Sequence, residues 1–276
     1  MMNYKTTILK TKLYILAFLC SMIAMGQEGE VHEISLTHVG DPGKLMWNVI
    51  DGSIKVEGYD GDKVLVMAKG RFKNKSKQNK KERDGLRRID ENSLSYTIEE
   101  RNNTVYISYS PGKSIIDMEV KVPRNFSLDL KTINRGEIIV DNVDGTHEVS
   151  NTNGPITMTN VGGSVIADAL NKDLIISFKT IHSDTDMMFS SLNGDIDITF
   201  PTSLKATINA RSDYGNVYTD FDIKMETKKS KTTTKGTNTS NVYKVKREKG
   251  IYGSINGGGA DMTFKTLNGD ILIRSN

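Results

Sequence analysis

Short segments in which apolar and polar residues alternate recur along most of the chain. They cover residues 32–36, 45–49, 53–56, 63–67, 104–109 and 117–122. Alternation with a period of two places the apolar side chains on one face of an extended strand. The pattern therefore predicts an all-β protein whose strands are each half buried.

A regular spacing of glycines adds a repeat to this pattern. Gly136, Gly145, Gly154 and Gly163 lie nine residues apart, and a short run with alternating apolar residues follows each. A fixed period indicates one small unit stacked many times, so we predict a single-stranded β-solenoid with two turns in every ~18 to 22 residues. An antiparallel β-sandwich is the alternative, because the same turns can close hairpins.

A longer phrase is also repeated. Residues 186–198 align without a gap with residues 261–273, and both contain Leu-Asn-Gly-Asp-Ile; residues 130–140 are the same phrase with one residue inserted. Asn tolerates left-handed backbone angles and Gly adopts them freely. We therefore expect the four spaced glycines and the Asn-Gly pairs to be turn residues, the pairs being Asn193 with Gly194 and Asn268 with Gly269.

The N-terminal residues have the composition of an export signal. Lysines precede an apolar run at residues 13–24, and small residues follow at Ala24 and Gly26. This pattern predicts a signal peptide at 1–26 and a single mature domain at 27–276, in the periplasm or at the cell surface. The apolar run is too short to span a bilayer. The bulky Leu19 before Cys20, the single cysteine, argues against a lipid anchor at that position.

Charge and cysteine content exclude several classes of function. The chain has 37 Lys and Arg against 34 Asp and Glu, and loss of the three lysines in residues 1–26 leaves 34 of each. The composition therefore gives no case for nucleic-acid binding. A mature chain without cysteine has neither disulfides nor zinc-thiolate sites.

Two basic segments interrupt the repeat, at about residues 69–90 and 224–249. We expect both to be inserted between rungs of the solenoid. The first could contact anionic lipids, anionic envelope polymers or the acidic flank of another copy. Its possible partner contacts are Arg71, Lys73, Lys75, Lys77, Lys80 and Lys81.

Residues that could carry chemistry are few. The four histidines are scattered, and no nucleophile motif or metal-ligand spacing is present. We therefore predict a protein that is not an enzyme and that needs no cofactor or metal. The alternative is a carbohydrate-active β-helix enzyme that uses Asp195 and Asp197, because alternate residues of a strand point the same way.

The repeated Leu-Asn-Gly-Asp-Ile phrase and the nine-residue glycine spacing resemble the bacterial DUF4097 family, the adhesin-like or "toastrack" β-solenoid domain, over residues 40–276. The resemblance implies an exported scaffold without agreed catalytic residues, linked in some bacteria to envelope stress. The leading hypothesis is an adhesin-like solenoid that binds an envelope glycan or protein through its flat face or its inserts. An envelope-stress sensor or effector is a further alternative.

Overall fold

The computed structural model describes residues 31–72, 94–109, 114–226, 231–237, 240–246 and 250–276, which contain strands and no helix. The strands form one 20-stranded sheet and a separate two-stranded sheet. They are β1 (Val31–Ser35), β2 (Gly43–Asp51), β3 (Ile54–Tyr59), β4 (Lys63–Phe72), β5 (Tyr96–Arg101), β6 (Thr104–Tyr109), β7 (Ser114–Pro123), β8 (Phe126–Asn134), β9 (Ile138–Asp141), β10 (Asp144–Asn151), β11 (Ile156–Ala169), β12 (Leu174–Ile181), β13 (Met187–Ser191), β14 (Ile196–Phe200), β15 (Ala206–Ser212), β16 (Val217–Thr219), β17 (Ile223–Met225), β18 (Lys231–Thr237), β19 (Ser240–Lys246), β20 (Ile251–Ile255), β21 (Ala260–Thr266) and β22 (Ile271–Ser275).

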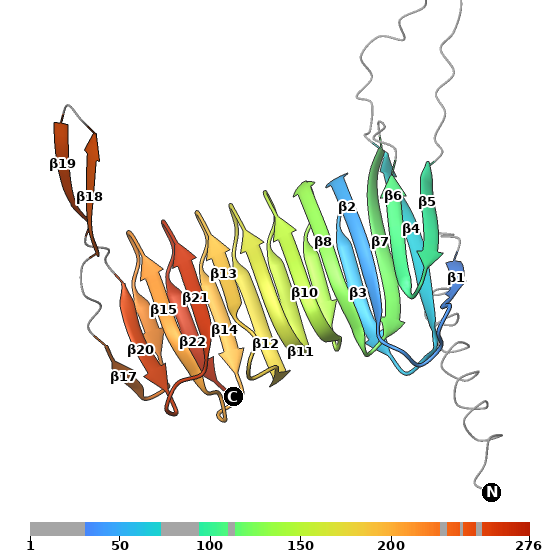
Figure 1. Ribbon diagram of the computed structural model, residues 1–276. Helices are drawn as coiled ribbons and strands as arrows, with labels where there is room; N and C mark the ends of the chain where they lie inside the picture. The colour runs from blue at the N-terminus through green and yellow to red at the C-terminus, as the bar shows by residue number, and fades with distance from the viewer. Residues whose placement is uncertain (1–30, 73–93, 110–113, 227–230, 238–239, 247–249) are drawn as a thin grey trace, which may run out of the picture.

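The large sheet is wound into a flattened coil with two rows of stacked strands (Figure 1). Face A is the row β5, β6, β2, β8, β10, the second half of β11, β13, β21, β15, β20 and β17. Face B is the row β1, β4, β7, β3, β9, the first half of β11, β12, β14, β22 and β16. Neighbours are parallel through the middle of the stack and antiparallel at the N-terminal end of both faces and at the C-terminal end of face A, whereas β22 and β16 at the end of face B are parallel. The predicted β-solenoid is confirmed, and antiparallel pairing is confined to the ends.

The register gives the length of one coil. Val140 pairs with Met158 and Met158 with Ile176, which is a step of 18 residues, while Ile176 pairs with Ile198, a step of 22. These steps match the period predicted from the glycine spacing. Each coil contributes one strand to face A and one to face B, so the nine-residue spacing is half a coil.

We call a strand of face A together with the strand of face B that follows it a rung. The rungs do not stack in the order in which they occur along the chain. The rung β2–β3 lies between β6–β7 and β8–β9, and the rung β21–β22 lies between β13–β14 and β15–β16. The two gap-free copies of the repeated phrase therefore lie on neighbouring rungs. Met187 pairs with Met262 and Ile196 with Ile271, so copies 75 residues apart stack in register.

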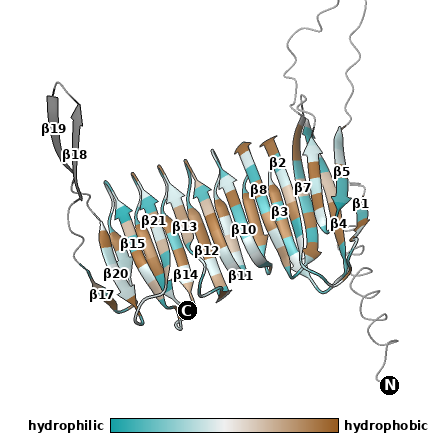
Figure 2. Cartoon of the chain, in the orientation of Figure 1, coloured by the Kyte–Doolittle hydropathy of each residue, from teal (hydrophilic) through white to brown (hydrophobic). Residues whose placement is uncertain are grey.

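The core fills the space between the two faces. Figure 2 shows the alternation of hydrophobic and hydrophilic residues along the strands, and the inward positions are mostly buried Ile, Val, Leu and Met. Four phenylalanines pack together in the C-terminal half, with ring centroids 5.1 Å apart for Phe178 and Phe200 and for Phe189 and Phe264. These four rings form one aromatic cluster, while Trp47 and Phe126 are buried separately in the N-terminal half of the core.

The two basic segments differ from the expected loops. Residues 69–72 belong to β4, which pairs with β7 as far as Phe72 and Ser114. Residues 73–90 lie outside the described residues, as does the predicted signal peptide. The second segment leaves the sheet after β17 and returns at β20, its antiparallel partner, and it contains the β18–β19 hairpin. Among the described residues, no helix has the length and hydropathy of a membrane span.

Candidate interaction surface

A column of glycines lies at the corner where the rungs pass from face A to face B, and Lys172 interrupts it on the rung formed by β11 and β12. An added Cβ would stand 1.8 Å from the Gly52 carbonyl oxygen at Gly136, 1.8 Å from the Gly136 oxygen at Gly154, and 2.0 Å from the Gly194 oxygen at Gly269. Gly136, Gly154, Gly194 and Gly269, like Asn193 and Asn268, have no positive φ, whereas Gly52 has a φ of 144°. The expected reason was therefore wrong for the Asn-Gly pairs. Gly136, Gly154 and Gly269 are required because backbones of successive rungs approach closely.

The other two glycines of the nine-residue spacing lie at the opposite corner, where the chain returns to face A. Gly145 belongs to β10 and Gly163 to β11, so both are strand residues and the predicted turn assignment is corrected for them. Gly163 has a φ of 98°, which does favour glycine, and its Cβ would stand 2.0 Å from the Gly145 oxygen.

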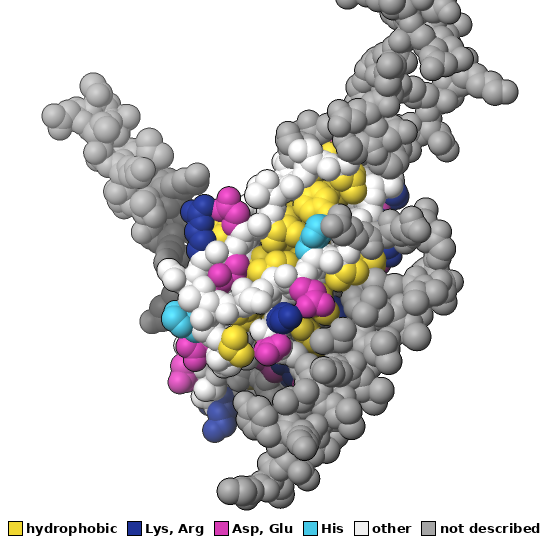
Figure 3. All heavy atoms as spheres, turned by 90° about the vertical axis from the view of Figure 1, so that its right-hand side faces the viewer, with side chains coloured by type: hydrophobic (Ala, Val, Ile, Leu, Met, Phe, Trp, Pro, Cys, Tyr) yellow, Lys and Arg dark blue, Asp and Glu magenta, His cyan; other side chains and the backbone are white. Residues whose placement is uncertain are grey.

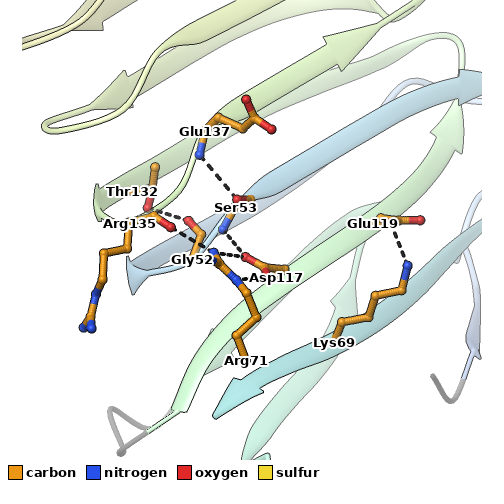
Figure 4. Close-up of polar contacts among 9 residues, drawn as sticks. All are labelled: Gly52, Ser53, Lys69, Arg71, Asp117, Glu119, Thr132, Arg135 and Glu137. Atoms are coloured by element: carbon orange, nitrogen blue, oxygen red, sulfur yellow. Dashed lines mark hydrogen bonds and ion pairs between the residues drawn. The ribbon is translucent and has the colours of Figure 1, made fainter. Parts of the chain in front are cut away.

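Buried polar side chains hold the carbonyl groups of the glycine column. Thr132 donates to the Gly52 oxygen at 2.9 Å, Asn151 to the Gly136 oxygen at 3.1 Å, and Thr266 to the Gly194 oxygen at 3.1 Å (Figure 4 shows the first). The side-chain oxygens of Asn151 and Ser191 also accept the N–H of the glycine three residues later, each at 2.9 Å. A Thr, Asn or Ser shortly before the corner glycine is the sequence signal for these hydrogen bonds. Our prediction from the sequence did not include it.

An amide row runs along the outside of the same corner, formed by Asn134, Asn153, Asn171, Asn193 and Asn268. After Asn134, each asparagine donates from its Nδ2 to the Oδ1 of the asparagine before it in the row. The N···O distances are 2.7 Å for the bond donated by Asn153, 3.0 Å for Asn171, 2.8 Å for Asn193 and 2.7 Å for Asn268. All four bonds lie at the surface. Their direction is uniform, from the C-terminal rungs toward the N-terminal rungs.

An aliphatic row lies beside the amide row, at the edge of face A. Each residue of this row directly precedes a residue of the amide row or, for Ile50, its counterpart Asp51. Ile50 and Ile133 are each 44% exposed, and Leu192 is 38% exposed. Leu170 and Leu267 are partly exposed. Thr152 occupies the position between Ile133 and Leu170, so the row is continuous over six rungs and apolar in all but one.

The two carboxylates of the enzymatic alternative take part in contacts between rungs. Asp195 accepts the backbone N–H of Asp270 at 2.8 Å, and its own N–H donates to Asp173 at 3.0 Å. Asp197 is held by both donor groups of Arg274, at 2.7 and 3.0 Å. Both oxygens of the Asp197 carboxylate are therefore engaged by the guanidinium of the neighbouring rung. The pair therefore stabilises the stack of rungs.

Arg71, the single residue of the predicted basic contact that the structure describes, is engaged within the chain. Its guanidinium forms an ion pair with Asp117 and donates to the Arg135 carbonyl at 2.9 Å, while Asp117 accepts the N–H of Ser53 at 2.8 Å (Figure 4). Arg71 thus joins three rungs. Lys73, Lys75, Lys77, Lys80 and Lys81 lie outside the described residues, so their contact with a partner stays a prediction.

His147 is the one histidine buried in the core among those described. It lies in register with Leu128 and Val165 on the neighbouring strands, and neither ring nitrogen has a hydrogen-bond partner among the described residues. Burial lowers its pKa to about 4, although the nearby carbonyls of Val143 and Gly162 act in the opposite direction. No group of three or more potential metal ligands occurs in the described part of the chain.

The two ends of the stack present different side chains. At the N-terminal end, β1 and β5 approach each other, and the His32 Nε2 atom lies 2.7 Å from the Tyr96 hydroxyl group. Hydrophobic side chains gather across this end (Figure 3), where Ile34, Leu94 and Ile98 pack partly buried against the core. At the C-terminal end, Tyr214 is 81% exposed in the turn before β16.

These features define the class of the molecule, a two-faced β-solenoid whose surface rows repeat from rung to rung. A family model described as Toastrack DUF4097 matches residues 125–251, from just before β8 to the start of β20. The family resemblance carried by the repeated phrase is confirmed for this part of the chain. The match is shorter than residues 40–276, over which the resemblance was expected.

Comparison with solved structures gives a more distant similarity. The chain is similar to the crystal structure of a "putative cell adhesion protein" from Clostridium sporogenes, with 13% sequence identity and a TM-score of 0.42. The alignment covers 90% of this chain and 99% of the other. No curated protein matches the sequence.

Proposed function

We propose that this chain is an exported, adhesin-like scaffold that is not an enzyme and that binds an envelope or extracellular partner along its outer surface. One observation carries the proposal: the side chains with catalytic potential are engaged between rungs, whereas uncharged rows remain open to solvent along a corner. Asp195, Asp197 and Arg71 are the examples. Export rests on the apolar N-terminal run at residues 13–24.

The architecture suits binding of an extended partner. Each rung contacts mainly its neighbours, so a solenoid presents long surfaces on which side chains recur at a regular spacing. The Toastrack match supports a scaffold of this type. Recognition then depends on which side chains occupy the outward positions, because the inward positions are used to fill the core.

Binding to the cell envelope tests the proposal directly. The purified protein should bind saturably to isolated envelope material of the producing cell, and unlabelled protein should compete with labelled protein. Polysaccharide incubated with the protein should release no new reducing ends. Absence of saturable binding to envelope glycan, lipid and protein fractions alike would overturn the proposal, and steady product release would favour the enzymatic alternative.

A further inference from the structure

We propose that the corner formed by the amide and aliphatic rows binds a linear, neutral polysaccharide. We call this surface the corner stripe. It consists of Asn134, Asn153, Asn171, Asn193 and Asn268 in one row and Ile50, Ile133, Thr152, Leu170, Leu192 and Leu267 in the other. The inference rests on the proposed function and names the partner class of that scaffold.

No charged side chain occupies either row of the corner stripe between Ile133 and Asn268. Beside the amide row, Lys172 is exposed, and the carboxylates of Asp173, Asp195 and Asp270 each accept a backbone N–H of the next rung. Charged residues at its two ends are paired within the chain, Asp51 with Arg135 and Asp213 with Arg211. Two uncharged rows beside a row of carboxylates neither attract an anionic polymer nor compensate its charge on desolvation, so they favour a neutral ligand.

The side-chain amides of the corner stripe have hydrogen-bonding capacity that the ladder does not use. A side-chain amide has two N–H groups and an oxygen with two lone pairs. In Asn153, Asn171 and Asn193 the ladder uses one donor and one acceptor of each. One N–H and one lone pair therefore remain on each amide, and these are the partners that sugar hydroxyl groups need. The adjacent aliphatic side chains can cover the C–H surface of a sugar ring.

The corner stripe is long and narrow. Neighbouring strands lie about 4.8 Å apart, so the six rungs from Ile50 to Leu267 extend over roughly 24 Å. The apolar part is only one residue wide, and Thr152 interrupts it. A globular protein partner needs a broad patch with a desolvated centre. A long, narrow stripe with polar and apolar groups repeated at a constant step fits a linear polymer.

The last rung supplies an aromatic group in line with the stripe. Ser212 pairs with Thr266, so Tyr214 occupies the position that Asn268 has on the preceding rung. The Tyr214 N–H donates to the Leu267 carbonyl at 2.9 Å, which fixes the backbone there, and the side chain is 81% exposed. A ring with an apolar face and a hydroxyl group is well suited to stack on a sugar.

Two double variants test whether binding depends on the corner stripe or on the rest of face A. Ile133→Ser/Leu192→Ser removes two exposed side chains of the stripe. Ile166→Ser/Met188→Ser is the matched control, because these residues are 47% and 46% exposed on the same face. Tyr214→Ala tests the aromatic end with little risk to folding. Thermal melting should show that all three variants remain folded.

Binding is measured with hydroxyethyl cellulose and dextran as neutral probes and hyaluronan as an anionic probe. We expect a neutral probe to bind, with little dependence on salt. Ile133→Ser/Leu192→Ser should weaken this binding roughly tenfold or more, Tyr214→Ala should weaken it less, and the control pair should leave it unchanged.

Three results would overturn the inference. One is envelope binding that persists while neither neutral probe binds, which leaves the proposed function standing. Another is binding of a neutral probe that Ile133→Ser/Leu192→Ser and its matched control weaken equally, or that neither double variant weakens. The third is stripe-dependent binding of hyaluronan or of a protein in place of the neutral probes. Loss of all envelope binding would instead remove the proposed function itself.

Discussion

At the scale of single residues, the glycine column sets the distance between rungs. Gly136, Gly154 and Gly269 are each so close to a carbonyl oxygen of the next rung that a methyl group has no room. The buried hydroxyl and amide groups of Thr132 and Asn151 satisfy the same carbonyls. At these glycines the corner is therefore both closely packed and hydrogen-bonded, and a larger residue has no room, although Lys172 occupies the equivalent position on one rung.

Gly269→Ala should lower stability strongly. The new Cβ would be 2.0 Å from the Gly194 oxygen, so the rung must shift, at a cost of about 2 kcal/mol. Urea denaturation followed by circular dichroism would measure the change in unfolding free energy. Gly250→Ala is the control, because its nearest neighbours are 3.2 Å away at the tip of the Tyr252 side chain. An equal effect of both substitutions would contradict the close-approach argument.

His147 makes stability depend on pH. Its folded pKa of about 4 lies below the usual 6.5, so the group contributes fully above pH 6.5, and this stability is lost as the pH falls toward 4. The neighbouring Asp144 favours the protonated form and His182 opposes it, but burial dominates. Between pH 7 and pH 5 the expected loss is about 2 kcal/mol.

Denaturation of the native chain and of His147→Leu at the two pH values checks this prediction. Leucine occupies the register position on β8, at Leu128, so the substitution should be accommodated. It should reduce the loss between pH 7 and pH 5, whereas His38→Gln, an exposed site, should not. If His147→Leu retained the full dependence on pH, another group would be responsible.

At the scale of elements, each rung is one strand of face A, a corner and one strand of face B. The copies of this element that are most alike in sequence, β13–β14 and β21–β22, are also stacked on each other. The rungs β13–β14 and β15–β16 do not pair with each other. The rung β21–β22 lies between them and pairs with both. The last strands of the chain therefore lie inside the stack.

Removal of residues 260–276 should abolish cooperative folding of the C-terminal rungs. The deletion takes away the buried side chains of Met262, Phe264, Ile271 and Ile273, each worth roughly 1.5 to 3 kcal/mol. The sum approaches the whole stability of a typical domain. Thermal melting by circular dichroism, together with binding of an apolar dye, would reveal the loss.

The β18–β19 hairpin offers a deletion of similar size as a control. Its strands pair only with each other, in a sheet separate from the coil. Replacement of residues 228–248 by a short Gly-Ser linker should leave the melting temperature of the coil nearly unchanged. A large decrease would show that the hairpin contributes to the solenoid.

At the scale of the whole molecule, stability should vary along the axis of the stack. A central rung has a neighbour on both sides, whereas an end rung has one. β12 pairs with β11 and β14, while β17 pairs with β20 alone over three residues. Local opening should therefore begin at the ends.

Hydrogen exchange measures this gradient. Amides of β10 to β14 should exchange slowest, and amides of β16 and β17 should exchange at least tenfold faster, a ratio that corresponds to about 1.4 kcal/mol. Uniform protection along the stack would mean that the coil unfolds as a single unit. In that case the rungs would be coupled more strongly than nearest-neighbour contacts predict.

Much of the architecture follows from the sequence because it is local. The period of two predicts strands, the glycine spacing predicts coils of 18 residues, and the repeated phrase identifies residues that occupy equivalent places, such as Asn193 and Asn268. These inferences need no knowledge of which rung lies next to which. They depend only on backbone conformation and side-chain alternation, which neighbouring residues determine.

The order of the rungs and the corner stripe were decided by the tertiary structure. Nothing local indicates that β21–β22 inserts between earlier rungs, because that choice depends on pairing across 75 residues. Asn134, Asn153, Asn171, Asn193 and Asn268 become a row, and Asp197 meets Arg274, only after the coils stack. The sequence alone determined the repeating unit and its period. The stacking of the coils determined which side chains became neighbours, since those contacts join segments that are distant along the chain.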